Sequence, residues 1–259
     1  MSVRVAKSAG FCFGVSRAVE LVEQAAKAGK TVVTLGPIIH NHHVVDKFRA
    51  LGVEVIDAPE QASPGQTVII RSHGVSRAVY EELQRRGVEI IDATCPFVKR
   101  IHGIVSRAEE EGQLPVIIGT PTHPEVEGIA GWCRDCRVFE TLDGLKNWAY
   151  SKEDLKNSPI CMVSQTTLTE SLWKMCGEFA KKQFTNLKIF DTICRATEYR
   201  QSEAAGLSEI CQAMVVVGDP KSSNTGRLAM ICREHCGRVF LVDNASELRP
   251  EDFRGDRKS

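Results

Sequence analysis

The amino-acid sequence predicts an α/β protein made of three similar αβα modules with small parallel sheets. Short apolar runs rich in β-branched residues alternate with stretches of helical spacing along the whole chain. Such runs are typical of parallel strands that helices bury on both faces. A partial internal repeat marks similar modules, and no low-complexity segment or flexible linker separates them. We therefore expect the modules to pack tightly around a shared centre.

The predicted strands are short runs of mostly apolar residues, bounded by turn residues. In chain order they are Val3–Ala6, Thr31–Leu35, Thr67–Ile70, Glu89–Asp92, Pro115–Ile118, Ile160–Val163, Leu187–Phe190, Met214–Val217 and Arg238–Val242. Helices are predicted between them, where apolar residues recur every three or four positions. The clearest examples are residues 15–30, 75–87 and 96–112.

The internal repeat aligns EIIDATC, which ends at Cys95, without gaps on KIFDTIC, which ends at Cys194. Both segments give a strand, an Asp three residues before the Cys, the Cys itself and then a helix. The segment that ends at Cys12 has the same order of strand, turn, Cys and helix. We therefore predict a first module over residues 13–95, a second over 96–193 and a third over 194–259, with an N-terminal strand within residues 1–12.

Composition excludes several classes of protein. The chain has 259 residues and a formal net charge of zero, so the strongly basic footprint of a nucleic-acid-binding protein is absent. No apolar run is long enough for a membrane span, and the N-terminus lacks the apolar core of a signal peptide. We expect a cytoplasmic protein. Its ten cysteines then favour metal or cluster ligation for some thiols and inert burial for the others.

Polar side chains follow the predicted strands at their carboxyl ends, which is where open parallel sheets bind ligands. If the modules meet at these ends, the side chains face one cavity. The residues are Cys12, His40, His73, Cys95, His123, Glu125, Thr166, Cys194, Ser222, Ser223 and Asn224.

Cys12, Cys95 and Cys194 each lie at a turn before a helix, whose N-terminus favours a thiolate. Three thiolates can ligate three irons of a four-iron cluster and leave the fourth iron open to a substrate, whereas electron carriers usually use four cysteines. Cys161, Cys176 and Cys211 instead fit the ordinary role of a buried, small hydrophobic residue. The sequence thus predicts an iron–sulfur enzyme.

Other motifs have two interpretations. Cys133 and Cys136 form a CxxC motif, and Cys232, His235 and Cys236 lie close together in the sequence. Together they could form the structural zinc site of a zinc-binding protein or serve in a redox-regulatory protein, but ordinary burial of these cysteines is the simpler interpretation.

His40 and His73 could cap helices or bind an anion. Ser222 or Ser223 could cap a helix, and the same geometry forms a phosphate site. Glu125 beside His123 suits proton delivery in an enclosed cavity, although a solvated Glu in a helix first turn is the common alternative.

The sequence resembles the 4-hydroxy-3-methylbut-2-enyl diphosphate reductase (LytB/IspH) family in segments that follow the family's order. They run from Cys12 to about Leu228, most of the chain, and are specific in combination although each is weak alone. The segments are AGFCFGVSRAVE, GPIIHN, RSHG, DATCPFV, HPEVEG, SQTT, DTIC and SSNTGRL. The resemblance implies the last step of the non-mevalonate isoprenoid pathway, in which an allylic diphosphate alcohol is reductively dehydroxylated to isopentenyl and dimethylallyl diphosphate.

The resemblance also implies a role for each matching residue. Cys12, Cys95 and Cys194 would bind one [4Fe–4S] cluster per chain, with the modules around it and the substrate hydroxyl on the unique iron. Glu125 would supply protons with His123 beside it, and Thr166 would orient the hydroxyl and relay protons. The diphosphate would be bound by His40, His73, His123, Ser222, Ser223 and Asn224. Electrons would come from a ferredoxin or flavodoxin, because the sequence contains no flavin or nicotinamide motif.

Two features depart from the family pattern. GDPK replaces the more usual polar turn before Ser222. Family members also continue with another strand and a Gly-Ala-Ser turn whose serine contacts the diphosphate, whereas the given sequence stops at Ser259, before that element. Either the sequence is part of a longer chain, or the protein lacks this strand and this ligand. An alternative function is that of another three-cysteine cluster enzyme, such as a quinolinate synthase-like dehydratase, although SQTT and HPEVEG argue against it.

Overall fold

The structure is a computed structural model that describes residues 2–151 and 153–253. Residues 254–259 of the predicted third module lie outside these ranges. The chain divides into two compact units. The larger unit holds Phe11–Ile39 and His43–Cys194, and the smaller unit holds the described parts of Met1–Gly10, His40–His42 and Arg195–Ser259. The predicted division into three modules at Cys95 and Cys194 stays a prediction.

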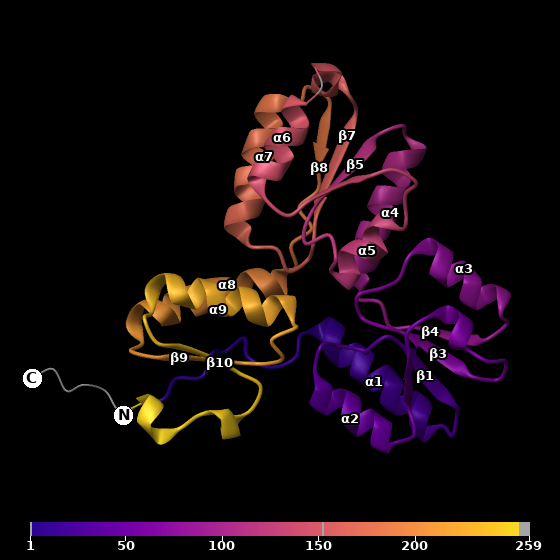
Figure 1. The fold of residues 1–259 in the computed structure, drawn as a ribbon, viewed down its shortest axis with the longest axis vertical. Coiled ribbons are helices and arrows are strands. Elements are labelled where there is room, and N and C mark those ends of the chain that lie inside the picture. Colours follow the sequence, from indigo (N-terminus) through magenta and orange to yellow (C-terminus); the bar gives the residue numbers. More distant parts are fainter. Residues whose placement is uncertain (1, 152, 254–259) are drawn as a thin grey trace, which may run out of the picture. The chain divides into compact units, whose positions relative to one another are not determined.

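The larger unit contains two four-stranded parallel sheets of the same topology, with strand orders β2-β1-β3-β4 and β6-β5-β7-β8 (Figure 1). The elements of the first sheet are α1 (Phe13–Lys27), β1 (Val32–Leu35), α2 (His42–Ala50), β2 (Glu54–Ile56), the 3-10 helix η1 (Pro59–Gln61), β3 (Thr67–Ile70), α3 (Arg77–Arg85) and β4 (Glu89–Asp92). Those of the second are α4 (Pro96–Glu110), β5 (Leu114–Ile118), α5 (Pro124–Ala130), β6 (Arg137–Phe139), α6 (Leu142–Tyr150), the 3-10 helix η2 (Glu153–Asn157), β7 (Ile160–Ser164), α7 (Glu170–Gln183) and β8 (Leu187–Ile189). The prediction of an α/β fold with small parallel sheets is confirmed.

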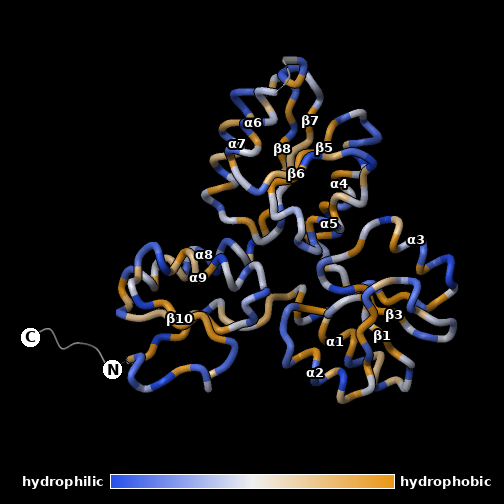
Figure 2. The backbone as a smooth tube through the Cα atoms, in the orientation of Figure 1, coloured by the Kyte–Doolittle hydropathy of each residue, from blue (hydrophilic) through white to orange (hydrophobic). Residues whose placement is uncertain are grey.

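Helices cover both faces of each sheet, as the apolar strands predict. In the first sheet, Val32 and Ile69 pack against α1 and α2, whereas Val33 and Val68 pack on the face that α3 covers. Neighbouring strand residues therefore point to opposite faces of the sheet, and both faces are buried from solvent. In the second sheet, α6 and α7 cover one face and α4 and α5 the other (Figure 1). The central strands accordingly have a hydrophobic colour in Figure 2.

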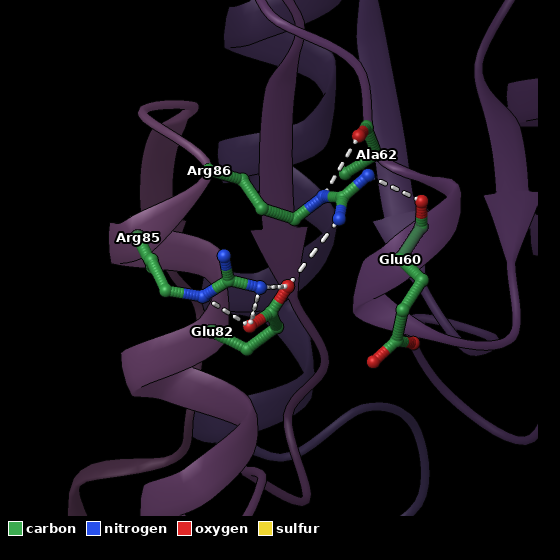
Figure 3. A network of polar contacts seen from close by, with 5 residues as sticks. All are labelled: Glu60, Ala62, Glu82, Arg85 and Arg86. Atoms are coloured by element: carbon green, nitrogen blue, oxygen red, sulfur yellow. Dashed lines mark hydrogen bonds and ion pairs between the residues drawn. The ribbon is translucent and has the colours of Figure 1, made fainter.

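A polar network ties the end of α3 to η1 in the first sheet (Figure 3). The Arg86 guanidinium donates from Nε to the carbonyl of Ala62 at 3.1 Å and from Nη1 to Glu82 at 3.3 Å, and it also donates to the carbonyl of Glu60. Arg85 donates to the same Glu82 carboxylate at 2.6 Å. These hydrogen bonds, above all the one from Arg85, lower the pKa of Glu82. The network fixes the connection between β2 and β3, which carries the chain back to the centre of the sheet.

The smaller unit contains a third, two-stranded parallel sheet in which β9 pairs with β10. Its elements are α8 (Arg195–Ile210), β9 (Met214–Val217), α9 (Ser223–His235), β10 (Val239–Val242) and the 3-10 helices η3 (Ala245–Glu247) and η4 (Pro250–Phe253). The N-terminal segment is tied to α8, because the amides of Lys7 and Ser8 donate to Glu203 at 2.7 and 2.8 Å. Among the described residues, no helix is long and apolar enough to cross a membrane.

Two predictions about strands need correction. The strand predicted over Val3–Ala6 is not formed: residues 2–12 contain no strand, and the side chains of Val3 and Val5 are each 80% exposed because no neighbouring strand pairs with them. Conversely, β2 and β6 were not predicted. Both are three-residue strands at sheet edges, too short to show a periodicity.

Candidate active site

Each predicted cysteine ligand lies at the start of a helix. Cys12 is the N-cap of α1, Cys95 is the N-cap of α4, and Cys194 directly precedes α8. All three are half-buried and belong to the larger unit. A helix N-terminus places the positive end of the helix dipole beside each sulfur, which favours the thiolate that metal binding requires.

Cys12 and Cys194 both lie close enough to Cys95 to influence its thiol. Burial raises the pKa of the Cys95 thiol, and the charges of Cys12 and Cys194 raise it further, while the amides of Phe97 and Val98 act in the opposite direction. Thiolates that repel one another are stabilised when metal cations lie between them. The donor set therefore fits a metal centre.

Gly14 allows α1 to approach Cys95 closely. A Cβ atom at this position would lie 2.6 Å from the Cys95 Sγ and 3.2 Å from its Cβ. Because glycine has no side chain, the first turn of α1 can pack directly against this sulfur and bring Cys12 towards it. A glycine at position 14 is thus what makes the close approach of α1 to Cys95 possible.

The internal repeat is visible in the hydrogen bonds of the two later cysteines. The amide of Cys95 donates to the carbonyl of Ser72 at 2.9 Å, and the amide of Cys194 donates to the carbonyl of Thr166 at 3.0 Å. Ser72 follows β3 and Thr166 follows β7, which occupy equivalent places in their sheets. Each cysteine is therefore fixed to the loop after the neighbouring strand.

The aspartate of each repeat shapes the turn that precedes the cysteine. Asp92 Oδ1 accepts the amide of Thr94 at 3.0 Å, and Asp191 Oδ1 accepts the amide of Ile193 at 3.4 Å. A side chain that bonds to the backbone two residues later is typical of turns initiated by Asp. The shared Asp of EIIDATC and KIFDTIC thus has a structural role in presenting each thiol.

Glu125 and Thr166 form a buried pair at the carboxyl ends of the neighbouring strands β5 and β7. The Glu125 side chain is 3% exposed and that of Thr166 is 7% exposed. The Thr166 amide donates to Glu125 Oε1 at 2.6 Å, and the Thr166 hydroxyl donates to Oε2 at 2.8 Å. The carboxylate is therefore held in one orientation, and the hydroxyl is the group through which it can exchange a proton with a ligand.

His123 lies beside this pair as the N-cap of α5. Its Nδ1 accepts the amide of Glu125 at 3.1 Å, so the neutral ring carries its proton on Nε2. The His73 ring meets the His123 ring edge-on, with 5.5 Å between their centroids. The larger unit therefore brings together His73, His123, Glu125 and Thr166 as a set of proton donors and acceptors.

The remaining predicted ligands belong to the smaller unit, where Ser222 is the N-cap of α9. Ser222 Oγ accepts the amide of Thr225 at 3.4 Å, so the predicted helix cap is present. Ser223 Oγ accepts a hydrogen bond from Arg227 Nε at 3.3 Å, and Asn224 follows in the same turn. His40 is assigned to this unit as well. A helix N-terminus with two hydroxyls and an amide is suited to an anion.

Sequence reasoning missed Arg17 and Gly14 as parts of this site. Arg17 donates from Nη1 to the carbonyl of Thr94 at 3.3 Å and from Nη2 to the carbonyl of Asp92 at 3.2 Å. It thereby ties α1 to the turn before Cys95. Both missed residues lie in the segment AGFCFGVSR around Cys12, and that proximity was the available signal.

The other cysteines separate into two groups. Cys161 and Cys176 are fully buried, as predicted, and burial raises the pKa of each thiol to about 11. Cys211 is half-buried rather than buried. Of the cysteines considered for a zinc site, Cys133 and Cys136 lie in the larger unit, whereas Cys232 and Cys236 are buried in the smaller one.

Comparison with known proteins places the site in a family. The model of the family described as LytB protein matches residues 3–258. The 4-hydroxy-3-methylbut-2-enyl diphosphate reductase of Thermoanaerobacter sp. (strain X514) is 42% identical over 256 residues, which are 97% of this chain and 87% of that protein. The enzyme of the same name from Aquifex aeolicus is 39% identical over 264 residues, covering 100% and 89% of the two chains.

Solved structures agree with the sequence relatives. One, described as (E)-4-hydroxy-3-methyl-but-2-enyl diphosphate reductase, the terminal enzyme of the non-mevalonate pathway, is 37% identical with a TM-score of 0.70 and covers 98% of this chain and 89% of its own. Another, the E-1-hydroxy-2-methyl-but-2-enyl-4-diphosphate reductase from Plasmodium falciparum, is 27% identical with a TM-score of 0.87 over 93% and 76%. The chain therefore belongs to the LytB family.

Proposed function

We propose that this chain reductively dehydroxylates 4-hydroxy-3-methylbut-2-enyl diphosphate to isopentenyl and dimethylallyl diphosphate. The observation that carries the proposal is the buried Glu125–Thr166 pair, which the larger unit combines with three cysteines at helix starts. Membership of the LytB family supports the choice of substrate. It also sets aside the quinolinate synthase-like alternative, because the matched relatives are named as reductases of this diphosphate.

Cys12, Cys95 and Cys194 would hold one [4Fe–4S] cluster per chain. When bound, such a cluster supplies electrons at an iron that has no protein ligand. The influence of Cys12 and Cys194 on the Cys95 thiol and the close approach of α1 to Cys95 that Gly14 allows fit this group. The helix N-termini behind Cys12 and Cys95 would offset part of the negative charge of the thiolates.

Glu125 would deliver protons in its protonated form. Replacing a C–OH bond by C–H and releasing water consumes two electrons and two protons, so the site needs a proton donor beside the hydroxyl. Thr166 Oγ is bonded to Glu125 Oε2 at 2.8 Å and can pass a proton from the carboxyl group to a bound hydroxyl. The low exposure of both side chains excludes bulk water from this path.

The diphosphate would be bound by imidazole, hydroxyl and amide donors. His73 and His123 provide N–H groups in the larger unit, and His40 provides one in the smaller unit. Ser222, Ser223 and Asn224 would contribute their side chains and backbone amides at the first turn of α9. Electrons would be delivered by an external carrier such as a ferredoxin or flavodoxin.

Turnover with a chemical reductant tests the proposal directly. The full chain, loaded with iron and sulfide under anaerobic conditions, is incubated with the allylic diphosphate and dithionite-reduced methyl viologen. We expect oxidation of the viologen with formation of both isoprenoid diphosphates. A protein that carries the cluster but neither oxidises the viologen nor converts the diphosphate would contradict the proposal.

A further inference from the structure

The loop between α5 and β6 presents two cysteines side by side at the surface of the larger unit. Cys133 and Cys136 are half-buried, whereas the intervening Arg134 and Asp135 are exposed. The inner sides of both cysteines contact the core that α4 and α5 form with the second sheet. The pair is thus held by the core on one side and open to a reaction partner on the other.

The two thiols interact with each other and differ in acidity. A hydrogen bond between them raises the pKa of Cys133 and lowers the pKa of Cys136. Arg137 favours the Cys136 thiolate further, although burial and Asp135 oppose it. Cys136 is therefore the thiol of the pair that ionises more readily, and Cys133, whose S–H is directed to the Ala130 carbonyl, is the thiol that stays protonated.

Neighbouring contacts fix the start of this loop. The Trp132 indole Nε1 donates to the carbonyl of Val75 at 2.8 Å, and the Cys133 thiol donates to the carbonyl of Ala130 at 3.4 Å. The loop contains no helix or strand between Gly131 and Cys136, so joining the two sulfurs breaks no regular hydrogen-bond ladder.

A metal site is a poorer explanation of the same pair. Within the part of the chain that the structure describes, no third His, Cys, Asp or Glu forms a group with these two thiols whose ligand atoms all lie within 4.8 Å of one another. The nearby Glu109 carboxylate instead accepts the backbone amide of Arg134. A structural zinc ion would need four such ligands.

We propose that Cys133 and Cys136 form a redox-active dithiol that a disulfide compound oxidises reversibly to an intrachain disulfide. The Cys136 thiolate attacks the oxidant, forming a mixed disulfide and releasing one thiol. Cys133 then loses its proton, attacks Cys136 Sγ in the mixed disulfide and releases the second thiol. The two cysteines lose two hydrogens, and the oxidant becomes two thiols. A dithiol reductant reverses the exchange. This site is separate from the proposed diphosphate chemistry.

Peptide-resolved alkylation tests the proposal on the full chain loaded with its cluster under anaerobic conditions. The protein is equilibrated with oxidised glutathione, and free thiols are then alkylated with iodoacetamide. The mass of the peptide that contains both cysteines is measured by mass spectrometry before and after reduction. We expect this peptide to lack both alkyl groups and to gain them after dithiothreitol treatment. The cysteine at position 161, buried in the core, is the internal control and stays reduced.

Two variants separate the roles of the thiols. In Cys133→Ser, the resolving thiol is missing, so glutathione should remain attached to Cys136. In Cys136→Ser, adduct formation at Cys133 should be slower than at Cys136 in the other variant, because burial and the charges of Glu109 and Asp135 still raise the pKa of the Cys133 thiol. The proposal is overturned if both cysteines of the unmodified chain stay alkylatable in oxidised glutathione. It is equally overturned if they are protected by one bound zinc ion per chain.

Discussion

At the scale of single residues, Glu125 and Thr166 are the part of the site whose geometry is most complete. The carboxylate accepts two hydrogen bonds from one residue, at 2.6 and 2.8 Å, and both side chains are buried. A carboxyl group in such surroundings can hold a proton and exchange it with the hydroxyl that contacts it. Its role can therefore be tested without disturbing the metal site.

Glu125→Gln should lower turnover at least about 100-fold. The glutamine side chain keeps an oxygen that can accept the Thr166 backbone N–H, but it has no acidic proton to give to the substrate. Turnover is measured with reduced methyl viologen, and the iron content is determined on the same sample. Glu127→Gln is the matched control, since Glu127 is exposed on the same helix. Equal turnover in the two variants would show that Glu125 is not the proton donor.

Gly14→Ala should reduce iron binding, because the added Cβ would lie 2.6 Å from Cys95 Sγ. The sulfur must then move away from its place beside α1. Gly103→Ala in α4 is the control, since a Cβ there meets nothing within 4 Å. Iron per chain after identical anaerobic reconstitution is the measurement. The same iron content in both variants would mean that Gly14 has no part in shaping the cysteine site.

His102 should make the folded state sensitive to acid. It is 4% exposed, and burial lowers its pKa to about 4 from 6.5, although Asp92 opposes this shift. The unfolded chain therefore binds more protons in this interval, and stability falls as the pH decreases from 6.5 towards 4. When the pH falls from about 7.5 to about 5, this residue should lower the free energy of unfolding by about 2 kcal/mol.

The free energy of urea unfolding, measured at both pH values, tests this expectation. His102→Asn removes the titrating group, so the variant should lose about 2 kcal/mol less than the unmodified chain between the two pH values. The variant has a lower stability at neutral pH because the ring stacks on Trp132, but only the difference between the two pH values matters. Equal pH dependence of both proteins would exclude a neutral, buried His102.

At the scale of elements, the start of α3 and the end of α5 meet through two small residues. A Cβ atom at Gly131 would lie 2.2 Å from the Ser76 Cβ and 2.9 Å from its Cα. The Arg77 amide also donates to the Gly131 carbonyl at 3.2 Å. This contact joins α3, which follows His73, to α5, which contains Glu125.

Gly131→Ala should destabilise the fold by about 1–3 kcal/mol, the range typical of overpacking, because backbone atoms cannot move aside as a flexible side chain would. Gly177→Ala in α7 is the control, since a Cβ there meets nothing within 4 Å and alanine favours a helix. Urea unfolding of both variants is the measurement. A Gly131→Ala protein as stable as the control would contradict the close contact.

The elements that the sequence predicted well are those with a strong local pattern. The strand, Asp, Cys and helix order of the internal repeat is present at both Cys95 and Cys194, because apolar strands and Asp turns depend on neighbouring residues. The strand predicted over Val3–Ala6 failed for the opposite reason: three apolar residues around Arg4 form a strand only if another strand pairs with them. The edge strands β2 and β6 were missed because their pairing, not their composition, defines them.

At the scale of the whole molecule, spacing along the chain could not reveal long-range contacts. The resemblance gave Glu125 and Thr166 their roles, but the hydrogen bonds between them span 41 residues. Gly14 beside Cys95 and Trp132 beside Val75 are likewise contacts between distant segments. The strand-end argument predicted that such residues share an edge of a sheet, and within the larger unit this holds for Glu125 and Thr166.

The central claim is that Cys12, Cys95 and Cys194 together bind one iron–sulfur cluster. Iron and acid-labile sulfide in anaerobically reconstituted protein measure it most directly. We predict about four irons and about four sulfides per chain, with both falling together when any one of the three cysteines is changed to Ser. Less than about one iron per chain in the unmodified protein, or an iron content that the three variants retain in full, would contradict the account.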